Sequence, residues 1–500
     1  MDLNNSAIDT QEISNKLVPG NPFPMLNTGN VHYEVAKKVQ AISWGGLGLM
    51  HQLADRLGLA ESIDSGVHVL RRHLPYHESD HVLSLAFNVM SGGTCLQDSE
   101  AKRLDPAYRE ALGARRLPAP STSGDFLRRF SAKDVEDLQE SLQEPRLKVW
   151  AAQPDEWRER ALIDVDGTLA ETTGKCKRGM DINYKGKWGY HPLVLSLANS
   201  NEVLYTVNRS GNRPSHDGAA PWIDRAVALT RRGGFKKVLV RGDTDFSLTE
   251  NFDRWSSDGV EFVFGMDACK PFVKRADALP EEDFEPLRRV RPEPKGPRRR
   301  KAERVKESIV VKRRFKKKRL VREDVAEFDY RPVRNKCKRT YRMVVLRKRV
   351  ENSEGQKMLF AEDIYFFYVT NVPREELSAA EVVRESNRRC NQENVIEQLK
   401  NGVEAMRMPS DTLESNWAYM AIASLAWNLK AWLALTLPKE SGARRLIGME
   451  FRRFYLRLIQ IPCQILRRGG RLIYRLLSTN GWTQLLLQGS TLLRTGRLAL

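Results

Sequence analysis

A mixed α/β fold is predicted for this chain of 500 residues by three features of its sequence. Apolar residues recur at spacings of three and four from Tyr33 to about Arg146, which indicates helices. After Trp157, short β-rich runs are separated by Gly and Asn, and a helical pattern and another β-rich run follow them. Helical patterns return from Ser378 to Leu437. Strands followed by alternating helices and strands indicate an α/β core.

The chain carries a strong positive charge. It has 82 Lys and Arg against 63 Asp and Glu, a formal net charge of +19. Such a field attracts polyanions, so nucleic acid is the first partner to expect. An anionic membrane surface would call for a basic amphipathic helix or a lipidation signal, and neither terminus clearly offers one. The polar start MDLNNSAIDTQEISNK is unlike a signal or transit peptide.

One apolar stretch, from Trp417 to Leu437, is long enough to span a bilayer. It carries Asn428 and Lys430 near its middle and has no second candidate beside it. Since polar groups are costly inside a bilayer, the stretch is interpreted as a buried helix.

Cysteines and histidines give no sign of a metal site. The six cysteines are far apart and form no C-x-x-C pair, which favours neither a disulfide framework nor a zinc ribbon and fits a reducing cytoplasm. Only His191 and His216 lie near the predicted core. His191 is therefore interpreted as structural.

The segment PSTSGDFLRRF, residues 120–130, offers Ser and Thr as helix caps before a helix that bears arginines. This arrangement would suit a DNA reader of the helix-turn-helix type. An ordinary helical bundle explains the pattern at least as well, so both interpretations stay open.

Acidic residues at the ends of two β-rich runs are the main candidates for chemistry. In ALIDVDGT, alternation places Asp164 and Asp166 on one face. In VLVRGDTD, the apolar run ends at a Gly and Asp243. Such carboxylates suit Mg²⁺, because this hard cation prefers oxygen ligands and leaves positions for phosphate and water. The choices of Asp166 over Asp164 and of Asp243 over Asp245 stay open.

A third carboxylate is expected from a nearby helix. Arg389, Glu393 and Lys400 are offset by four and seven positions, so they share one stripe of a helix. Glu393 would then lie on the same face as two cations that can reach phosphate groups.

The motifs IDVDGT, VLVRGDTDF and NRRCNQENVIEQLKNG together resemble the DDE transposases of bacterial insertion sequences. The resemblance is to the group with a Y-x2-R-x3-E-x6-K signature and, within it, to the insertion-sequence thirteen-eighty family. Arg389, Glu393 and Lys400 take the Arg, Glu and Lys positions of that signature, whereas Ser386 stands where Tyr is usual. Further similar segments, such as YKGKWGYHPLVLSLANSNEVL, extend the resemblance over about residues 40–480.

The resemblance implies a DNA transposase whose catalytic and metal-binding residues are Asp166, Asp243 and Glu393. Two Mg²⁺ ions, for which Mn²⁺ can substitute, would assist phosphodiester cleavage and joining. The implied partners are the terminal inverted repeats of an insertion sequence, target DNA and a second copy of the chain in a synaptic homodimer, with no membrane. The implied location is a prokaryotic cytoplasm, in association with the nucleoid.

The resemblance also divides the chain into five segments. They are a helical DNA-binding region, the first part of an RNase H-like catalytic core, a basic and mainly β insertion, the second part of the core and an Arg-rich helical tail: residues 1–155, 156–268, 269–372, 373–440 and 441–500. The 150 positions between Asp243 and Glu393 agree with an insertion, because a single connection between a strand and a helix is far shorter.

The charge is concentrated between Arg289 and Arg322. This run has 17 Lys or Arg against three Glu, a net +14 that makes up most of the charge of the chain. A solvated, partly disordered linker is the usual explanation of such a run, and it is compatible with binding to phosphates. The predicted DNA contacts are Arg389, Lys400, Arg298, Arg299, Arg300, Lys316, Lys317 and Lys318.

Two other functions remain open. The sequence DVDGTL matches the first motif of haloacid dehalogenase-like phosphatases, in which Asp164 would be the nucleophile and Asp166 the general acid. That function would leave the charge and the helix of Glu393 without a role. It also requires an acidic residue four positions after Asp243, where this sequence has Ser247. A DNA-binding regulator without catalysis would explain the charge but not the carboxylates.

Overall fold

The computed structural model describes residues 32–34, 39–289, 306, 309, 313, 316–332, 337–354 and 357–495, without the side chains of residues 316–318 and 352–361. The chain divides into two compact units, residues 1–39 and 40–500. All the elements described below lie in the second unit.

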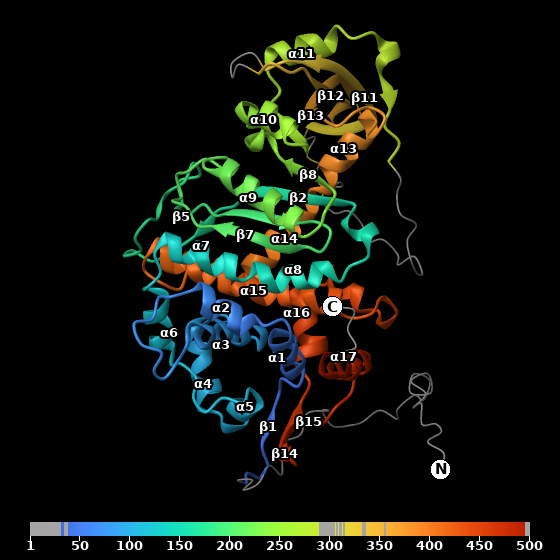
Figure 1. Ribbon diagram of the computed structural model, residues 1–500. Coiled ribbons are helices and arrows are strands. Elements are labelled where there is room, and N and C mark those ends of the chain that lie inside the picture. Colours follow the sequence, from blue (N-terminus) through green and yellow to red (C-terminus); the bar gives the residue numbers. More distant parts are fainter. Residues whose placement is uncertain are drawn as a thin grey trace, which may run out of the picture. The chain divides into compact units, whose positions relative to one another are not determined.

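A nine-stranded mixed sheet organises this unit (Figure 1). Its strands, in spatial order, are β10 (Glu285–Pro286), β11 (Lys316–Tyr330), β12 (Tyr341–Glu354), β13 (Lys357–Thr370), β9 (Val260–Met266), β8 (Lys237–Gly242), β2 (Arg160–Gly167), β6 (Leu193–Leu197) and β7 (Glu202–Val207). β8 is parallel to β2 and to β9, whereas the other neighbouring pairs are antiparallel. The predicted mixed α/β class is confirmed.

The two central strands are buried because their apolar side chains alternate between two apolar clusters. Leu162 of β2 and Leu239 of β8 pack with α13 (Ala379–Arg388). Ile163 belongs to the main core, which includes α9 (Ala219–Arg232), and α9 packs on β2, β6 and β8. By this alternation, Asp164 and Asp166 lie on the face of β2 that α13 covers together with α14 (Cys390–Asn401).

The chain before the sheet is helical, as predicted. The helices are α1 (Leu47–Arg56), α2 (Leu59–Gly66), α3 (Glu78–Met90), α4 (Ser99–Leu104), α5 (Pro106–Ala111), α6 (Pro120–Leu127), α7 (Ala132–Ser141) and α8 (Gln143–Ala151). Two short helices, α10 (Phe252–Ser257) and α11 (Lys270–Asp277), flank β9 in sequence, and a small separate sheet contains β3 (Ala170–Glu171), β5 (Trp188–Tyr190) and β4 (Asp181–Ile182).

The long apolar stretch forms the buried helix α15 (Leu413–Thr436), as predicted. It packs against α3, α7 and β7, and its polar residues have partners. The amide of Asn428 bonds to the backbone of Val203, at 2.8 Å to N–H and 2.9 Å to C=O. Lys430 donates to the carbonyl oxygen of Met449 at 2.6 Å. Within the described residues, no helix combines the length and the hydropathy that a membrane span requires.

The expected helix caps in the segment 120–130 are wrong. α6 begins at Pro120, and its N-cap is Ala119, which makes no side-chain capping bond. Proline suits the first helical position, because its φ is fixed and it has no N–H to leave unpaired. Ser121 and Thr122 therefore lie inside the first turn.

The tail from residue 441 is only partly helical, so the prediction of a helical tail is wrong. It contains α16 (Phe451–Phe454) and α17 (Thr483–Thr495), but β14 (Cys463–Arg468) and β15 (Arg471–Leu476) form an antiparallel hairpin. Gly469 and Gly470, with φ of 55° and 71°, make the turn that such a hairpin needs. β14 also pairs with β1 (Ala41–Ile42), so early and late parts of the chain meet in one sheet.

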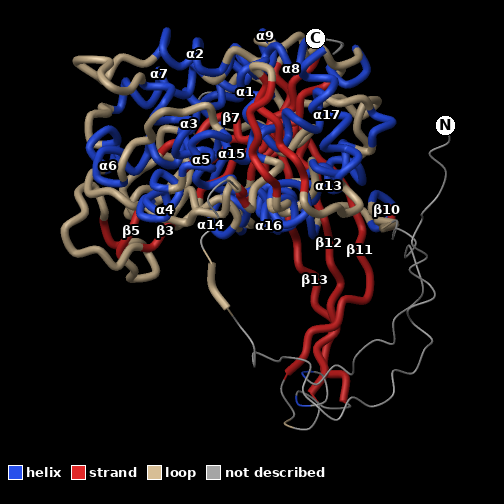
Figure 2. The backbone as a smooth tube through the Cα atoms, turned by 90° about the horizontal axis from the view of Figure 1, so that it is seen from below, coloured by secondary structure: helices blue, strands red, loops and turns tan. Residues whose placement is uncertain are grey.

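The segment predicted to be a mainly β insertion contains the three longest strands. β12 lies between β11 and β13 and pairs with each of them along most of its length. The pairing of β13 with β9 covers only Phe367–Thr370. Figure 2 shows the three strands running out beyond their neighbours as an arm that continues the core sheet.

Candidate active site

Two carboxylates stand at the ends of the parallel strands β2 and β8. The register pairs Asp164 with Arg241, so two residues further along each strand Asp166 comes level with Asp243. Burial raises the pKa of Asp166 to about 6, Arg389 opposes this rise, and the negative charge of Asp243 adds to it. The two carboxylates are therefore close enough to repel each other.

Asp243 directly follows β8 and is the N-cap of a short 3₁₀ helix, Thr244–Phe246. Its Oδ1 accepts a hydrogen bond of 3.0 Å from the N–H of Asp245. Burial raises the pKa of Asp243, and the charge of Arg389 opposes this rise. The side chain of Asp245 itself is exposed.

Arg389 is the cation nearest to this pair. Its Nη1 lies 3.1 Å from Oδ2 of Asp166, and both side chains are only 16% exposed. It stands between α13, which ends at Arg388, and α14, which begins at Cys390. Its N–H bonds to the carbonyl of Ser386, three residues back, at 3.2 Å, so the backbone tightens here. The expected continuous helix from Arg389 to Lys400 is thus interrupted at its first residue.

Lys400 interacts electrostatically with Asp166. Burial lowers the pKa of its ammonium group, and the charges of Glu397, Glu171 and Asp166 oppose this shift. Lys400 and Arg389 thus both place positive charge beside Asp166, although they reach it from opposite ends of α14.

Glu393 lies on the first turn of α14 with an exposed side chain. Among the described residues, no three Asp, Glu, His or Cys side chains lie close enough together to hold a metal ion. The structure thus brings Asp166 and Asp243 together but does not place Glu393 with them. These two carboxylates fit a hard divalent cation, which would offset their mutual repulsion, and Arg389 supplies part of that positive charge.

Asp164 has a different role, which sequence reasoning missed. It is 1% exposed, and its two oxygens accept hydrogen bonds of 2.7 and 2.9 Å from the guanidinium of Arg241. Arg241 also donates to Glu385 of α13 at 2.9 Å. Burial raises the pKa of Asp164, and Arg241 opposes this rise. The arginine within the apolar run VLVRG was the available signal, because a buried charge requires a partner.

His191 lies beside the end of β2. Its Nδ1 is 2.6 Å from the carbonyl oxygen of Arg213, and a Cβ on Gly167 would come within 3.0 Å of its Nε2. Burial lowers its pKa, and the charges of Asp245 and Lys400 also act on it. Its interpretation as structural stays a prediction.

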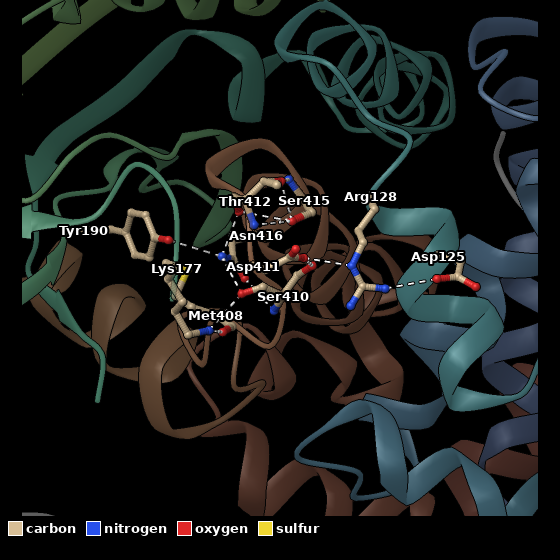
Figure 3. Close-up of polar contacts among 10 residues, drawn as sticks. All are labelled: Asp125, Arg128, Lys177, Tyr190, Met408, Ser410, Asp411, Thr412, Ser415 and Asn416. Atoms are coloured by element: carbon tan, nitrogen blue, oxygen red, sulfur yellow. Dashed lines mark hydrogen bonds and ion pairs between the residues drawn. The ribbon is translucent and has the colours of Figure 1, made fainter. Parts of the chain in front are cut away.

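The loop from Gly402 to Thr412, which joins α14 to α15, is held on two sides (Figure 3). On one side, Lys177 donates to the carbonyl oxygen of Ser410 at 2.9 Å. On the other, Nε of Arg128, just after α6, donates to Asp411 at 2.8 Å. Both contacts lie just before α15, so they hold the end of this loop against the chain around Lys177 and against α6.

The predicted DNA contacts in the basic run are not placed by the structure. Arg298, Arg299 and Arg300 lie outside the described residues. Lys316, Lys317 and Lys318 begin β11, opposite residues 352–354 of β12, and their side chains are not described.

Comparison with known proteins identifies the family. A family model described as transposase DDE domain, group 1, matches residues 35–497. No curated protein matches the chain. Among solved structures, it is similar to a piggyBac transposase synaptic complex with hairpin DNA, with a TM-score of 0.35 and 10% identity over 83% of this chain and 80% of that chain. Because the family model covers most of its length, this chain belongs to group 1 of the transposases with a DDE domain.

Proposed function

We propose that this chain binds the terminal inverted repeats of an insertion sequence, cleaves DNA at the element ends and joins those ends to target DNA. The observation that carries the proposal is the pair of Asp166 and Asp243 at adjacent strand ends, with Arg389 against Asp166. Mutually repelling carboxylates at a sheet edge suit metal-dependent phosphoryl transfer, which is the chemistry of the family.

Asp166, Asp243 and Glu393 would hold two Mg²⁺ ions, or Mn²⁺ in their place. When bound, such ions lower the pKa of a water molecule and stabilise the leaving 3′ oxygen. In this role Glu393 must approach the pair. It lies on the first turn of α14, directly after the tightened backbone at Arg389.

The cations of the site would act on DNA. Arg389 contacts Asp166 and Lys400 interacts electrostatically with it, so both cations can bind phosphates next to the bond that is cut. Arg298, Arg299, Arg300, Lys316, Lys317 and Lys318 would add phosphate contacts along the basic run.

The core is proposed to be RNase H-like. The order β7-β6-β2-β8-β9, with three antiparallel strands followed by two strands parallel to β2, supports this assignment. The proposal also includes the five-segment division and membership of the Y-R-E-K group and of its insertion-sequence thirteen-eighty family. It further includes a synaptic homodimer and a nucleoid-associated cytoplasmic location.

The test is a cleavage assay on DNA that carries the terminal repeats, with Mg²⁺, Mn²⁺ or EDTA. Asp243→Asn and Glu393→Gln are compared with Asp245→Asn and Glu397→Gln, which remove the same charge from exposed neighbours on the same elements. Metal-dependent cutting at the repeat boundary should disappear in the first two variants and persist in the other two. Unchanged cutting by Glu393→Gln would remove that residue from the site.

The two alternative functions predict other results. A regulator would bind the repeats and never cut them. A phosphatase would hydrolyse small phosphate esters through Asp164, but both oxygens of this residue are bound to Arg241 in a fully buried position, which leaves no access for a substrate.

A further inference from the structure

A cavity of about 830 Å³ lies among the N-terminal helices and contains none of the candidate active-site residues. Its lining comes from α3 and the chain before it, and from α4, α5, α6 and their flanking loops. One acidic residue, Asp125, lines it. Six arginines line it as well: Arg71, Arg72, Arg103, Arg109, Arg116 and Arg129. We call it the arginine cavity.

Most of this positive charge is not neutralised by the protein. Arg103 pairs with Glu100 at 2.7 Å, and Asp125 pairs at 3.0 Å with Arg128, which is not part of the lining. Of the six lining arginines, Arg71, Arg72, Arg116 and Arg129 are exposed and have no ion pair with any described residue. Arginines that find no acidic partner in the fold remain available to an external anion.

A buried polar group also faces this cavity. His81 lines it, is 3% exposed, and has no hydrogen-bond partner at Nδ1 among the described residues. Its ring stacks on Phe126 with centroids 4.3 Å apart. Burial and, to a smaller extent, the charge of Arg129 lower the pKa of His81 to about 4, so the ring is neutral at pH 7. A buried polar atom without a partner is destabilising, so a ligand that supplies one is favoured.

A second cavity adjoins the arginine cavity and enlarges it, although its own two arginines are paired with acidic residues. This second cavity, of about 500 Å³, shares Arg103, Ala119 and Asp125 with the first and reaches Arg128 on the other side of α6. The two together are much larger than one phosphate and receive arginines from several separate segments. This spread suits a chain of phosphates better than a single small anion.

We propose that the arginine cavity binds backbone phosphates of DNA, as a contact site separate from the carboxylates. This inference rests on the proposed function, because it takes DNA as the substrate. The guanidinium groups at the rim hold the phosphates, and His81 offers a hydrogen bond from the inner wall.

The first experiment measures the salt dependence of binding to repeat DNA by fluorescence anisotropy. Arg72→Ala/Arg116→Ala removes two exposed arginines of the cavity. Arg56→Ala/Arg453→Ala, the control, removes two exposed arginines from α1 and α16 that have no ion pair among the described residues. Each lost phosphate contact reduces the log-log salt slope by about 0.9, so the cavity variant should lose about two units and the control much less. Equal slopes in the two variants would overturn the proposal.

The second experiment maps the contact directly. Phenylglyoxal modifies accessible arginines, and mass spectrometry locates the adducts with and without repeat DNA. DNA should protect Arg71, Arg72, Arg116 and Arg129 but not Arg56. Protection of the four by tripolyphosphate and not by DNA would make the cavity a site for small anions and refute the assignment to DNA.

A cleavage measurement separates this inference from the proposed function. The control Arg56→Ala/Arg453→Ala should cut at the wild-type rate, whereas Arg72→Ala/Arg116→Ala should need a higher DNA concentration to reach half of its maximal rate, because it has lost phosphate contacts. Normal metal-dependent cutting by the wild type, together with arginines of the cavity that DNA does not protect, would refute only the assignment of DNA to this cavity. Protection of the cavity in a wild-type chain that never cuts DNA would refute only the transposase chemistry.

Discussion

Two aspartates of β2, two residues apart, have opposite surroundings. Asp164 is fully buried and bound through both oxygens to Arg241, whereas Asp166 lies at the sheet edge against Asp243 and Arg389. The first environment fixes a charge in place, and the second leaves a carboxylate able to exchange one cation for another. The same chemical group can thus serve packing or reaction, depending on its position along one strand.

Replacing Arg241 by Met should be strongly destabilising. The variant leaves Asp164 buried without its paired cation and removes one of the two arginines bound to Glu385, and breaking a buried ion pair costs about 3–5 kcal/mol. Urea denaturation gives the free energy of unfolding. Arg232→Met, which breaks an exposed pair with Glu144, is the control and should cost at most about 1 kcal/mol. Similar losses in the two variants would contradict the structural role of Asp164.

Lys430 should make stability depend on pH. Burial lowers its pKa to about 7, whereas a lysine in an unfolded chain titrates near about 10.4. Between these values the unfolded chain binds a proton that the folded chain does not, so the free energy of unfolding rises with pH. This contribution to stability is lost as pH falls toward 7.

Denaturation at pH 7.5 and 9.5 checks this expectation for Lys430. The free energy of unfolding of wild type should rise, relative to that of Lys430→Met, by up to about 1.4 kcal/mol per pH unit. The control Lys439→Met, at an exposed position, should follow wild type. Parallel curves for wild type and Lys430→Met would show that the carbonyls of Ile447 and Met449, 3.2 and 2.6 Å away, keep the ammonium charged.

At the level of elements, strand ends were easier to predict than contacts between elements. Asp166 and Asp243 follow apolar runs, so their place at a sheet edge is readable from local pattern. The pairing of Arg241 with Asp164 depends on which strands become neighbours, and local pattern does not contain that information. The break before Cys390 was also hidden, since no Gly or Pro marks it.

The hairpin β14–β15 shows how a helical pattern can mislead. Arg, Leu and Ile occur in both helices and exposed strands, and here the Gly-Gly turn decides the outcome. Only Cys463 and Ile465 of this hairpin are fully buried, which is the alternation of a strand.

Gly470→Ala should therefore lower the free energy of unfolding by about 1–2 kcal/mol, the cost of a left-handed conformation for a residue with a Cβ. Its φ is 71°, and a Cβ there meets no atom within 4 Å, so strain is the only expected effect. Gly481→Ala is the matched control, because its surroundings are equally open and its φ is not in the left-handed region. Chemical denaturation should show that the control lowers the free energy of unfolding by no more than about 0.5 kcal/mol.

At the scale of the second unit, early and late parts of the chain stabilise each other. β1 pairs with β14, α1 packs against α17, and the hydroxyl of Tyr474 donates to the carbonyl oxygen of Ala111 at 2.6 Å. A Cβ on Gly48 of α1 would come within 2.7 Å of the Tyr474 ring, so the hairpin lies directly on that helix. The N-terminal helices and the tail thus form one packed body.

Ending the chain after Gln460 should therefore destabilise the N-terminal helices, although the carboxylates are far from the cut in sequence. The truncation removes the strand partner of β1 and exposes the apolar face of α1, which includes Leu47, Leu49 and Leu53. Limited proteolysis should then cut first within residues 41–66, and thermal unfolding should begin at a lower temperature. A chain that ends after Thr495 is the control and should behave as wild type. If both chains resist protease equally between residues 41 and 66, the tail is not part of the cooperative unit, and DNA binding by the arginine cavity should then survive its removal.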